Sequence, residues 1–248
     1  MKIERYKHDS SGSFALGMTL TIELLKCRPE LVERVFLSPQ LEKSGYKDYL
    51  EELMERNHVP SVVSEKAFNV LSPKGNCFVI GQFKKFASEL KAEALHLCLV
   101  NPSDAGNMGT IMRTMVGFGV HDLAVVRPAV DAFDPRTVRA SMGALFHLRV
   151  KYYDDFSEYQ KEFPKYKPYP FMLRNSVPIH GVTFEEPCTL VFGNEGSGLP
   201  DDFDEVAQTA GGQAVLIPHS GEIDSLNLPM AAGIGLFEAT KKYWKGDT

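Results

Sequence analysis

Hydrophobic positions in the first ninety residues alternate between helical and strand periodicity. Residues 17–27 and 49–56 repeat apolar side chains every three to four positions, which predicts two amphipathic helices. Short apolar runs at 35–37, 59–63 and 77–83 predict strands. Together these elements predict a compact α/β unit. The side chains expected to face its core are Leu20, Leu24, Leu25, Leu50, Leu53 and Met54.

A second unit follows the charged segment 83–94, which lacks long apolar runs. Strand and helix patterns alternate in it, which predicts a parallel sheet covered on both faces. We therefore expect an α/β fold with two domains, residues 1–88 and 95–248, and treat 152–170 as a polar, aromatic excursion. The predicted strands are 95–100, 123–126, 189–192 and 214–217, and the predicted helices are 110–118, 136–145 and 228–243.

Composition excludes several classes of protein. The 248 residues are 44% hydrophobic and 24% charged, which excludes a disordered or fibrous chain. No apolar run approaches the roughly 18 residues of a membrane span, and the first residues lack the apolar region of a secretory signal. We expect a cytoplasmic protein with no membrane partner.

The formal net charge of -5 argues against a surface covered with nucleic-acid-binding charge. The charge is uneven: residues 1–91 carry 14 basic and 12 acidic side chains, and the rest carry 13 and 20. A local basic strip including Arg28, Lys84 and Lys85 is a candidate RNA contact, although solvated surface is an equal alternative.

The four cysteines, Cys27, Cys77, Cys98 and Cys188, are widely separated in the sequence. They form no C-x-x-C pair and no Cys/His ligand spacing. The spacing predicts reduced, mostly buried thiols, and neither a zinc site nor a redox pair.

The first segment with unusual chemistry is NPSDAGNMGTIMRTMVGFGV, residues 101–120. Asn107 lies where a helix could begin, so its side chain could cap the exposed amides. Arg113 follows among apolar residues, where a guanidinium is costly unless its donors meet an anion. The segment predicts a phosphate or carboxylate partner for Arg113. A capped helix with a solvated arginine is the alternative.

The second segment is LVFGNEGSGLP, residues 190–200, in which a strand ends at a loop with three glycines around Glu195. Its spacing is neither the G-x-G-x-x-G dinucleotide fingerprint nor the G-x-S-x-G nucleophile motif. Glycine allows close approach of another backbone or a ligand, so the loop predicts that something lies against its main chain.

The third segment, residues 216–239, contains a strand end at Pro218 and leads through Ser225 and Asn227 into the last helix. Both residue types are good helix caps. Gly233 and Gly235 within the helix predict close packing of another backbone, as in a helix dimer interface.

The three segments together resemble the SpoU/TrmH branch of the SPOUT family of RNA ribose 2′-O-methyltransferases. The matching motifs are N-x-G-x-x-x-R ending at Arg113, G-N-E-G-x-G-L at 193–199 and S-L-N-L at 225–228, with a less diagnostic match, VRASMGALF, at 138–146. The resemblance covers residues 97–240. The first ninety residues resemble only loosely the family's ribosomal-protein-like substrate-recognition domain.

The resemblance implies a trefoil knot in the C-terminal domain, a homodimer formed through that domain, and S-adenosyl-L-methionine as methyl donor without a metal. The acceptor is implied to be RNA, with ribosomal RNA favoured over transfer RNA. The implied catalytic residues are Asn107, Arg113, Glu195 and Asn227. The implied donor-binding residues are Leu190, Gly193, Asn194, Glu195, Gly196, Gly198, Ile217, Pro218, Ser225, Leu226 and Asn227.

Arg113 is treated in the family as a base, but a guanidinium is effectively always protonated. We therefore expect Arg113 to grip the phosphate beside the target ribose, Glu195 to position Arg113 or Asn107, and Asn227 to orient the ribose. The chain departs from the family in a longer loop before Asn107, in Met115 for alanine and in His219 for methionine.

Two other functions are compatible with the same fold. One is a catalytically inactive RNA-binding protein, against which the intact polar set argues. The other is a methyltransferase for a small molecule or a protein, against which the additional N-terminal domain argues.

Overall fold

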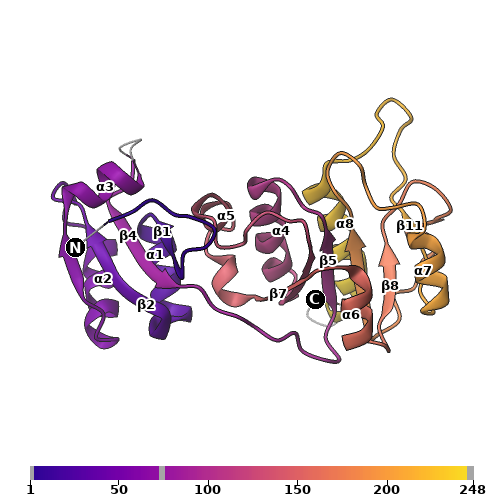
Figure 1. The fold of residues 1–248 in the computed structure, drawn as a ribbon, viewed down its shortest axis with the longest axis horizontal. Coiled ribbons are helices and arrows are strands. Elements are labelled where there is room, and N and C mark those ends of the chain that lie inside the picture. Colours follow the sequence, from indigo (N-terminus) through magenta and orange to yellow (C-terminus); the bar gives the residue numbers. More distant parts are fainter. Residues whose placement is uncertain (1–2, 73–75, 245–248) are drawn as a thin grey trace. The chain divides into compact units, whose positions relative to one another are not determined.

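A computed structural model describes residues 3–72 and 76–244, which form two compact α/β units (Figure 1). The first unit contains the residues up to Phe86 together with Asp131–His147, and the second contains Ala87–Val130 and the residues from Leu148 onward. Residues 131–147, which the sequence analysis included in the second domain, thus pack within the first unit. Residues 1–2, 73–75 and 245–248 of the expected domains lie outside the described ranges.

The first unit is built on a four-stranded sheet of order β1-β4-β2-β3. β4 is antiparallel to both β1 and β2, and β2 is parallel to β3. The strands are β1 (Gly12–Leu16), β2 (Val32–Leu37), β3 (Ser61–Val63) and β4 (Val79–Lys84), and the helices are α1 (Met18–Cys27), η1 (Pro29–Leu31), α2 (Gly45–Arg56), α3 (Glu65–Leu71), α5 (Pro135–Ala140) and η2 (Ala144–His147).

Helices cover both faces of this sheet. Alternation along β2 directs Val35 and Leu37 toward α1 and α2, and Phe36 toward α3. The six side chains predicted to face the core are all buried, so that prediction is confirmed. α3 was not predicted from the sequence. It is a short helix whose amino terminus is capped by the Ser64 side chain, which accepts a hydrogen bond from the Ala67 amide at 3.3 Å.

The second unit is built on a five-stranded parallel sheet of order β7-β6-β5-β10-β8. A two-stranded parallel sheet, β9 with β11, lies outside it. The strands are β5 (His96–Val100), β6 (Asp122–Val126), β7 (Arg149–Tyr153), β8 (Lys167–Pro170), β9 (Val177–Pro178), β10 (Cys188–Phe192) and β11 (Val215–Leu216), and the helices are α4 (Ala105–Gly117), α6 (Phe156–Glu162), η3 (Ile179–Gly181), α7 (Phe203–Thr209), α8 (Leu228–Thr240) and η4 (Lys241–Trp244).

The parallel sheet is covered on both faces, as the sequence predicts. On one face Val191 of β10 packs in a cluster with Tyr159 of α6 and Phe203 of α7. The next residue of β10, Phe192, points to the other face and contacts α8 at Gly235. On that face α8 packs against both β10 and α4.

Two sequence predictions about this sheet need correction. Residues 214–217 were expected in the main sheet, but β11 pairs with β9, and its link to the main sheet is an isolated parallel bridge from Val215 to Phe171, the residue after β8. The edge position belongs to β8, which lies within the stretch interpreted as an excursion, residues 152–170. The sequence of β8, KPYP, conceals a strand because proline cannot donate to a ladder, and an edge strand needs partners on one side only.

The prediction that the glycines of α8 pack against another backbone is wrong at Gly235. A Cβ on Gly235 would lie 2.7 Å from Cζ of Phe171 and 3.0 Å from Cζ of Phe192. These two rings are stacked with centroids 4.3 Å apart. Gly235 therefore makes room for aromatic rings of its own chain rather than for another backbone, and Gly233 has only an ordinary contact with Thr114.

All four cysteines are free thiols; Cys77, Cys98 and Cys188 are buried and Cys27 is partly exposed. Within residues 3–72 and 76–244, every helix is too short or too polar to cross a bilayer.

His96 lies fully buried at the start of β5 with both ring nitrogens in hydrogen bonds. Nδ1 is 2.9 Å from the Tyr159 hydroxyl and Nε2 is 2.7 Å from the Lys91 carbonyl. A neutral ring satisfies both contacts by accepting at Nδ1 and donating at Nε2. Burial lowers the pKa of His96, and the hydrogen bond to the Lys91 carbonyl opposes that shift only in part.

Acid is therefore expected to destabilise the fold through His96. Below the ordinary histidine pKa of about 6.5 the unfolded chain takes up a proton that the folded chain refuses, so stability falls as pH drops below that value. Thermal melts at pH 7.5 and 5.5 should show a smaller pH dependence for His96→Gln than for wild type. The control His58→Gln removes an exposed histidine and should leave the pH dependence unchanged. An equal dependence in His96→Gln would contradict this assignment.

Candidate functional site

The first two motif segments, residues 101–120 and 190–200, meet at one edge of the parallel sheet. β5 and β10 are neighbouring parallel strands, so their carboxyl ends, Val100 and Phe192, open on the same side. The loops that follow them are joined directly, because Asn194 Nδ2 donates to the Asn101 carbonyl at 2.8 Å. Residues almost a hundred positions apart thus form one surface.

The residue that caps α4 is Asp104, whose Oδ1 accepts from the Asn107 amide at 2.7 Å. The prediction that Asn107 is the cap is wrong, because the helix begins two residues earlier than Asn107, at Ala105. An aspartate is as good a cap as an asparagine, and pattern alone does not choose between them. The Asn107 side chain is consequently free for another role, and its Nδ2 donates to Glu195 Oε1 at 3.3 Å.

Glu195 joins the two loops by accepting hydrogen bonds from the other segment. Its Oε2 accepts from the Ser103 amide at 3.1 Å and from the Ser103 hydroxyl at 2.8 Å, and its Oε1 accepts from the Asp104 amide at 3.2 Å. Burial alone would raise the pKa of Glu195, but its own backbone amide and the bonds from Ser103 and Asn107 outweigh it and hold the pKa below its usual range. Glu195 is therefore ionised at neutral pH.

The glycines of the second segment close a tight turn. The Asn194 amide and the Gly198 carbonyl are hydrogen bonded at 3.1 Å, and the reverse pair at 3.0 Å. A Cβ on Gly193 would lie 2.2 Å from the Gly198 carbonyl carbon, a distance that no side chain can occupy. Gly198 itself has φ +70. The predicted close approach of a backbone thus comes, at Gly193, from the turn itself.

A pocket of about 390 Å³ opens beside this turn. It is formed by the turn, by the segment after β8, and by the chain from β11 to the start of α8. The predicted donor-binding residues that line it are Gly193, Asn194, Glu195, Gly196, Gly198, Ile217, Ser225 and Leu226. Of the others, Leu190 is buried within β10, and Pro218 and Asn227 are neighbours of lining residues.

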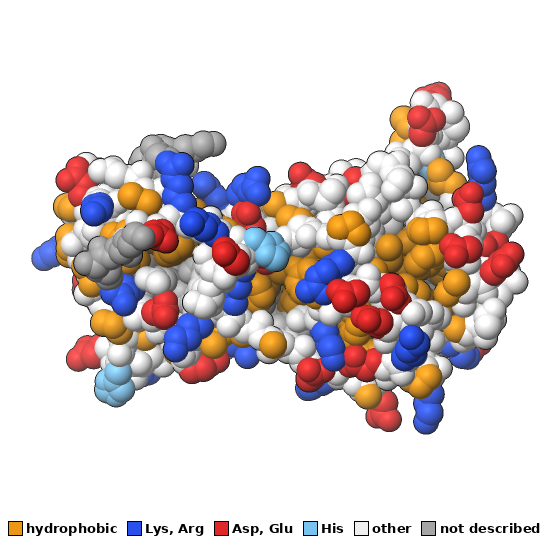
Figure 2. Space-filling view, in the orientation of Figure 1, with side chains coloured by type: hydrophobic (Ala, Val, Ile, Leu, Met, Phe, Trp, Pro, Cys, Tyr) orange, Lys and Arg blue, Asp and Glu red, His pale blue; other side chains and the backbone are white. Residues whose placement is uncertain are grey.

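One wall of the pocket was not predicted from the sequence. It is formed by residues 171–174, which follow β8. No motif marks these residues, and their position depends on a strand that the pattern concealed. Phe192 and Val215 supply apolar surface, and Asp201 and Asp224 add acidic groups. The loop between β11 and α8 projects from the second unit (Figures 1 and 2), and hydrophobic side chains gather beside its base (Figure 2).

This mixture of surfaces suits a ligand with a flat apolar part and a cationic part. Ligand pockets of small molecules range over roughly 300–1,000 Å³ and combine apolar walls with a few polar groups. The volume, the backbone groups of the turn and the acidic side chains here fall within that description.

Arg113 is exposed on α4, whereas Ile111, Met112 and Met115 are buried. The apolar neighbours of Arg113 therefore do not require an anion beside it, because helical periodicity turns the guanidinium to solvent. Within the described ranges no hydrogen bond or ion pair involves Arg113, so its donors are available to a ligand. Asn227 is the N-cap residue of α8 by position, yet its exposed side chain makes no capping hydrogen bond.

Two of the three residues of the expected basic strip have partners inside the first unit. Lys85 Nζ donates to Asp131 Oδ2 at 3.0 Å and to the His8 carbonyl at 2.8 Å. Arg28 Nε donates to the Phe146 carbonyl at 3.1 Å. Lys84 is exposed.

The chain is similar in sequence to several known proteins. A family model, described as the SpoU rRNA Methylase family, matches residues 94–237. An uncharacterised tRNA/rRNA methyltransferase of Synechocystis is 27% identical over 77% of this chain and 69% of its own length. The 23S rRNA (uridine(2479)-2′-O)-methyltransferase of Streptomyces viridochromogenes is 30% identical over 64% of this chain and 56% of its own length. The 23S rRNA (guanosine(2553)-2′-O)-methyltransferase of Bacillus subtilis is 27% identical over 70% and 69%.

Solved structures resemble the chain over nearly its whole length. The AdoMet-bound rRNA methyltransferase of Sinorhizobium meliloti has a TM-score of 0.76 and 28% identity, covering 94% of this chain and 88% of that one. A SpoU methyltransferase of Streptomyces viridochromogenes has a TM-score of 0.77 at 21% identity, covering 95% and 92%, which is a likeness of fold.

Proposed function

This chain belongs to the SpoU rRNA Methylase family, and we propose that it transfers the methyl group of S-adenosyl-L-methionine to a ribose 2′-hydroxyl of ribosomal RNA. The observation that carries the proposal is that the second and third motifs line one pocket at the carboxyl edge of the parallel sheet, while the first motif is hydrogen bonded to the second through Asn107 and Glu195. The 23S rRNA 2′-O-methyltransferases among its relatives support the acceptor. The AdoMet-bound structural relative supports the donor.

The residues of the pocket fit the donor. Backbone amides and carbonyls of 193–198 and the strand end at Ile217 suit an adenine ring, and Leu226 supplies apolar cover. The donor itself supplies an activated methyl group on a sulfonium. The protein therefore has two tasks: to align the acceptor oxygen with that methyl group and to accept or disperse the hydroxyl proton.

We assign the acceptor side to the polar set around α4. Glu195 holds the side-chain amide of Asn107 and the loop before α4 in place through the hydrogen bonds already described. Arg113 lies two turns along the same helix with an unoccupied planar fork, the geometry that binds a phosphate in two places. A phosphate held there would place its neighbouring ribose at the pocket. Arg113 then acts as a clamp that favours the ionised hydroxyl, and Asn227 as a group that orients the ribose.

Replacing Glu195 with glutamine is expected to lower kcat/KM for RNA by about 10- to 100-fold. The NH₂ group of the glutamine would face the N–H and O–H donors of the loop, so some of the hydrogen bonds that the carboxylate accepts would be lost. Because Glu195 also lines the donor pocket, the affinity for S-adenosyl-L-methionine should fall too, but by less than kcat/KM, since the glutamine keeps its size. Steady-state kinetics and donor calorimetry measure the two effects. The control Glu205→Gln changes an exposed glutamate of α7 and should match wild type. Unchanged RNA kinetics in Glu195→Gln would remove Glu195 from the positioning role.

The remaining expectations from the family belong to this proposal. We propose that the chain from β10 through β11 to α8 forms the family's trefoil knot, which the packing of α8 on β10 and α4 supports. We propose a homodimer through the C-terminal domain, supported by exposed apolar side chains on α8 and η4: Met230, Phe237, Tyr243 and Trp244. Sedimentation equilibrium tests the dimer. We assign RNA recognition to the first ninety residues and the location to the cytoplasm.

Incubation with methyl-labelled donor and total RNA tests the function. We expect label in the ribosomal RNA fraction, and label in transfer RNA instead would change the acceptor class. Donor binding by calorimetry without transfer to any RNA would support the alternative of a catalytically inactive RNA-binding protein.

A further inference from the structure

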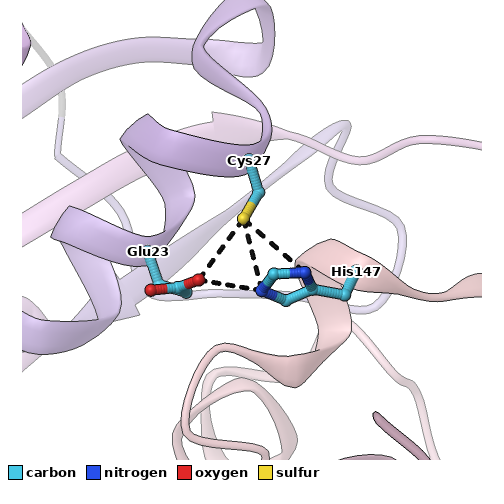
Figure 3. A group of neighbouring side chains, drawn as sticks. All are labelled: Glu23, Cys27 and His147. Atoms are coloured by element: carbon cyan, nitrogen blue, oxygen red, sulfur yellow. Dashed lines mark hydrogen bonds and ion pairs between the residues drawn. The ribbon is translucent and has the colours of Figure 1, made fainter. Parts of the chain in front are cut away.

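Three side chains from two separate stretches of the first unit converge on one point (Figure 3). Glu23 and Cys27 lie one turn apart on α1, and His147 ends η2. Cys27 Sγ is 3.3 Å from His147 Nε2 and 3.4 Å from Glu23 Oε1, and Glu23 Oε1 is 2.8 Å from His147 Nε2. One potential ligand atom from each residue thus lies within van der Waals distance of the other two.

The arrangement is not that of a nucleophilic cysteine. In a Cys–His–acid triad the acid binds the ring nitrogen opposite to the one that faces the thiol. Here the sulfur and the carboxylate oxygen both contact Nε2. Burial and the neighbouring Glu23 carboxylate also raise the pKa of the Cys27 thiol to about 11, so little thiolate is present at neutral pH. Convergence of sulfur, nitrogen and oxygen on one point is instead typical of a metal site.

We propose that Glu23, Cys27 and His147 bind a zinc ion. Bond lengths of about 2.3 Å to sulfur and 2.0–2.1 Å to nitrogen and oxygen, at tetrahedral angles, separate the ligand atoms by roughly 3.3–3.6 Å. Both separations from the sulfur already fall in that range, and the Glu23–His147 pair has to open by about half an ångström. Thiolate with imidazole selects zinc over magnesium or calcium, which take oxygen ligands.

The backbone around the cluster holds the ligands in place without a metal. A Cβ on Gly143 would lie 2.9 Å from both Cβ and Cγ of Glu23, and Gly143 has φ +92, so only glycine lets this stretch lie against α1. The hydrogen bond from Arg28 Nε to the Phe146 carbonyl fixes the residue next to His147. The ligands are preorganised, which lowers the entropic cost of binding.

Zinc binding at this cluster requires the loss of one proton. Zinc takes the place of the thiol proton of Cys27, which leaves to solvent, and His147 keeps its proton on Nδ1. Lys26 Nζ contacts Glu23 Oε2 at 3.3 Å, which leaves Oε1 for the metal. The side chains of Glu23 and His147 are 23% and 36% exposed, so water can complete the fourth position. The site links α1 to the stretch that ends at His147 and is independent of methyl transfer.

Titration of the chelator-stripped, full-length protein tests the site. We expect one equivalent of Zn²⁺ by calorimetry, a Zn²⁺-dependent rise in Tm, and a thiolate-to-metal charge-transfer band when Co²⁺ is the probe. Cys27→Ser should abolish the charge-transfer band and weaken the binding of Zn²⁺ at least 100-fold. His147→Gln should weaken the binding of Zn²⁺ about 10- to 100-fold. Two controls, Cys77→Ser and His58→Gln, remove a cysteine and a histidine elsewhere in the first unit and should bind as wild type does.

Two results would overturn the proposal. One is Co²⁺ binding without the thiolate band, and the other is Zn²⁺ affinity that Cys27→Ser leaves unchanged. Circular dichroism of each variant shows that it is folded, and Glu23→Gln, which keeps the cysteine and the histidine, provides a second ligand variant with an expected loss of about tenfold or more. Neither result affects the proposed methyl transfer, because no ligand of the cluster belongs to the pocket.

Discussion

Replacement of Gly193 with alanine is expected to weaken the binding of S-adenosyl-L-methionine by more than 100-fold. The new Cβ would lie 2.2 Å from the Gly198 carbonyl carbon and 2.4 Å from the Leu199 nitrogen, and both are backbone atoms that cannot rotate away. The turn must therefore open to make room for the alanine side chain. Opening it displaces the amides and carbonyls of 193–198 that line the pocket. Calorimetry with the donor measures the loss directly.

Two further glycine variants serve as comparisons for Gly193→Ala. Gly198→Ala places a side chain at φ +70, with nothing within 4 Å of the new Cβ, so its cost is a left-handed strain of roughly 1–2 kcal/mol in the folded protein. Its donor affinity should fall much less than that of Gly193→Ala. Gly221→Ala lies in open space on the loop before α8 and should bind as wild type does. Equal affinities for Gly193→Ala and Gly221→Ala, with intact far-ultraviolet circular dichroism, would mean that the turn does not form the donor site.

Replacement of Arg113 with alanine is expected to lower kcat by about 100- to 1,000-fold while donor affinity stays within threefold of wild type. Removing one charged group that stabilises developing negative charge has an effect of this size in enzymes. The side chain is exposed and lies outside the pocket lining, so the donor does not depend on it. Single-turnover transfer to RNA and donor calorimetry separate the two quantities.

Lysine at position 113 distinguishes a clamp from a point charge. It keeps the positive charge but lacks the planar fork that binds a phosphate in two places, so it should recover only a small part of the lost rate. Lys161→Ala removes an exposed basic side chain from α6 of the second unit and serves as control. Transfer by Arg113→Lys at nearly the wild-type rate would rule out the clamp.

The motif loops were predictable from the sequence because their chemistry is local. A strand followed by glycines at fixed spacing predicts a tight turn with an exposed backbone, and Gly193 and Gly198 form one. The contact between the two loops also follows from the topology, since neighbouring parallel strands end at the same edge. The partner of Glu195 was partly predicted: the hydrogen bond goes to Asn107, whereas none with Arg113 is found among the described residues.

Predictions failed where a residue's role depends on distant partners. Asp104 rather than Asn107 caps α4, because the choice between two good caps is made by where the strand before them ends. The edge strand β8 was hidden by its prolines, and with it the pocket wall at 171–174. The cluster at Cys27 could not be read from ligand spacing, since His147 lies 120 residues away and its stretch packs in the first unit.

The central claim is that the pocket beside Gly193 and the exposed Arg113 together direct a methyl group to an RNA sugar. Mass spectrometry of nucleosides from ribosomal RNA treated with the protein and S-adenosyl-L-methionine tests it most directly. The account predicts one additional 2′-O-methylated nucleoside, absent when Arg113→Ala replaces the wild-type protein. A methyl group on a base, or no new methylation of RNA by a protein that binds the donor, would contradict it.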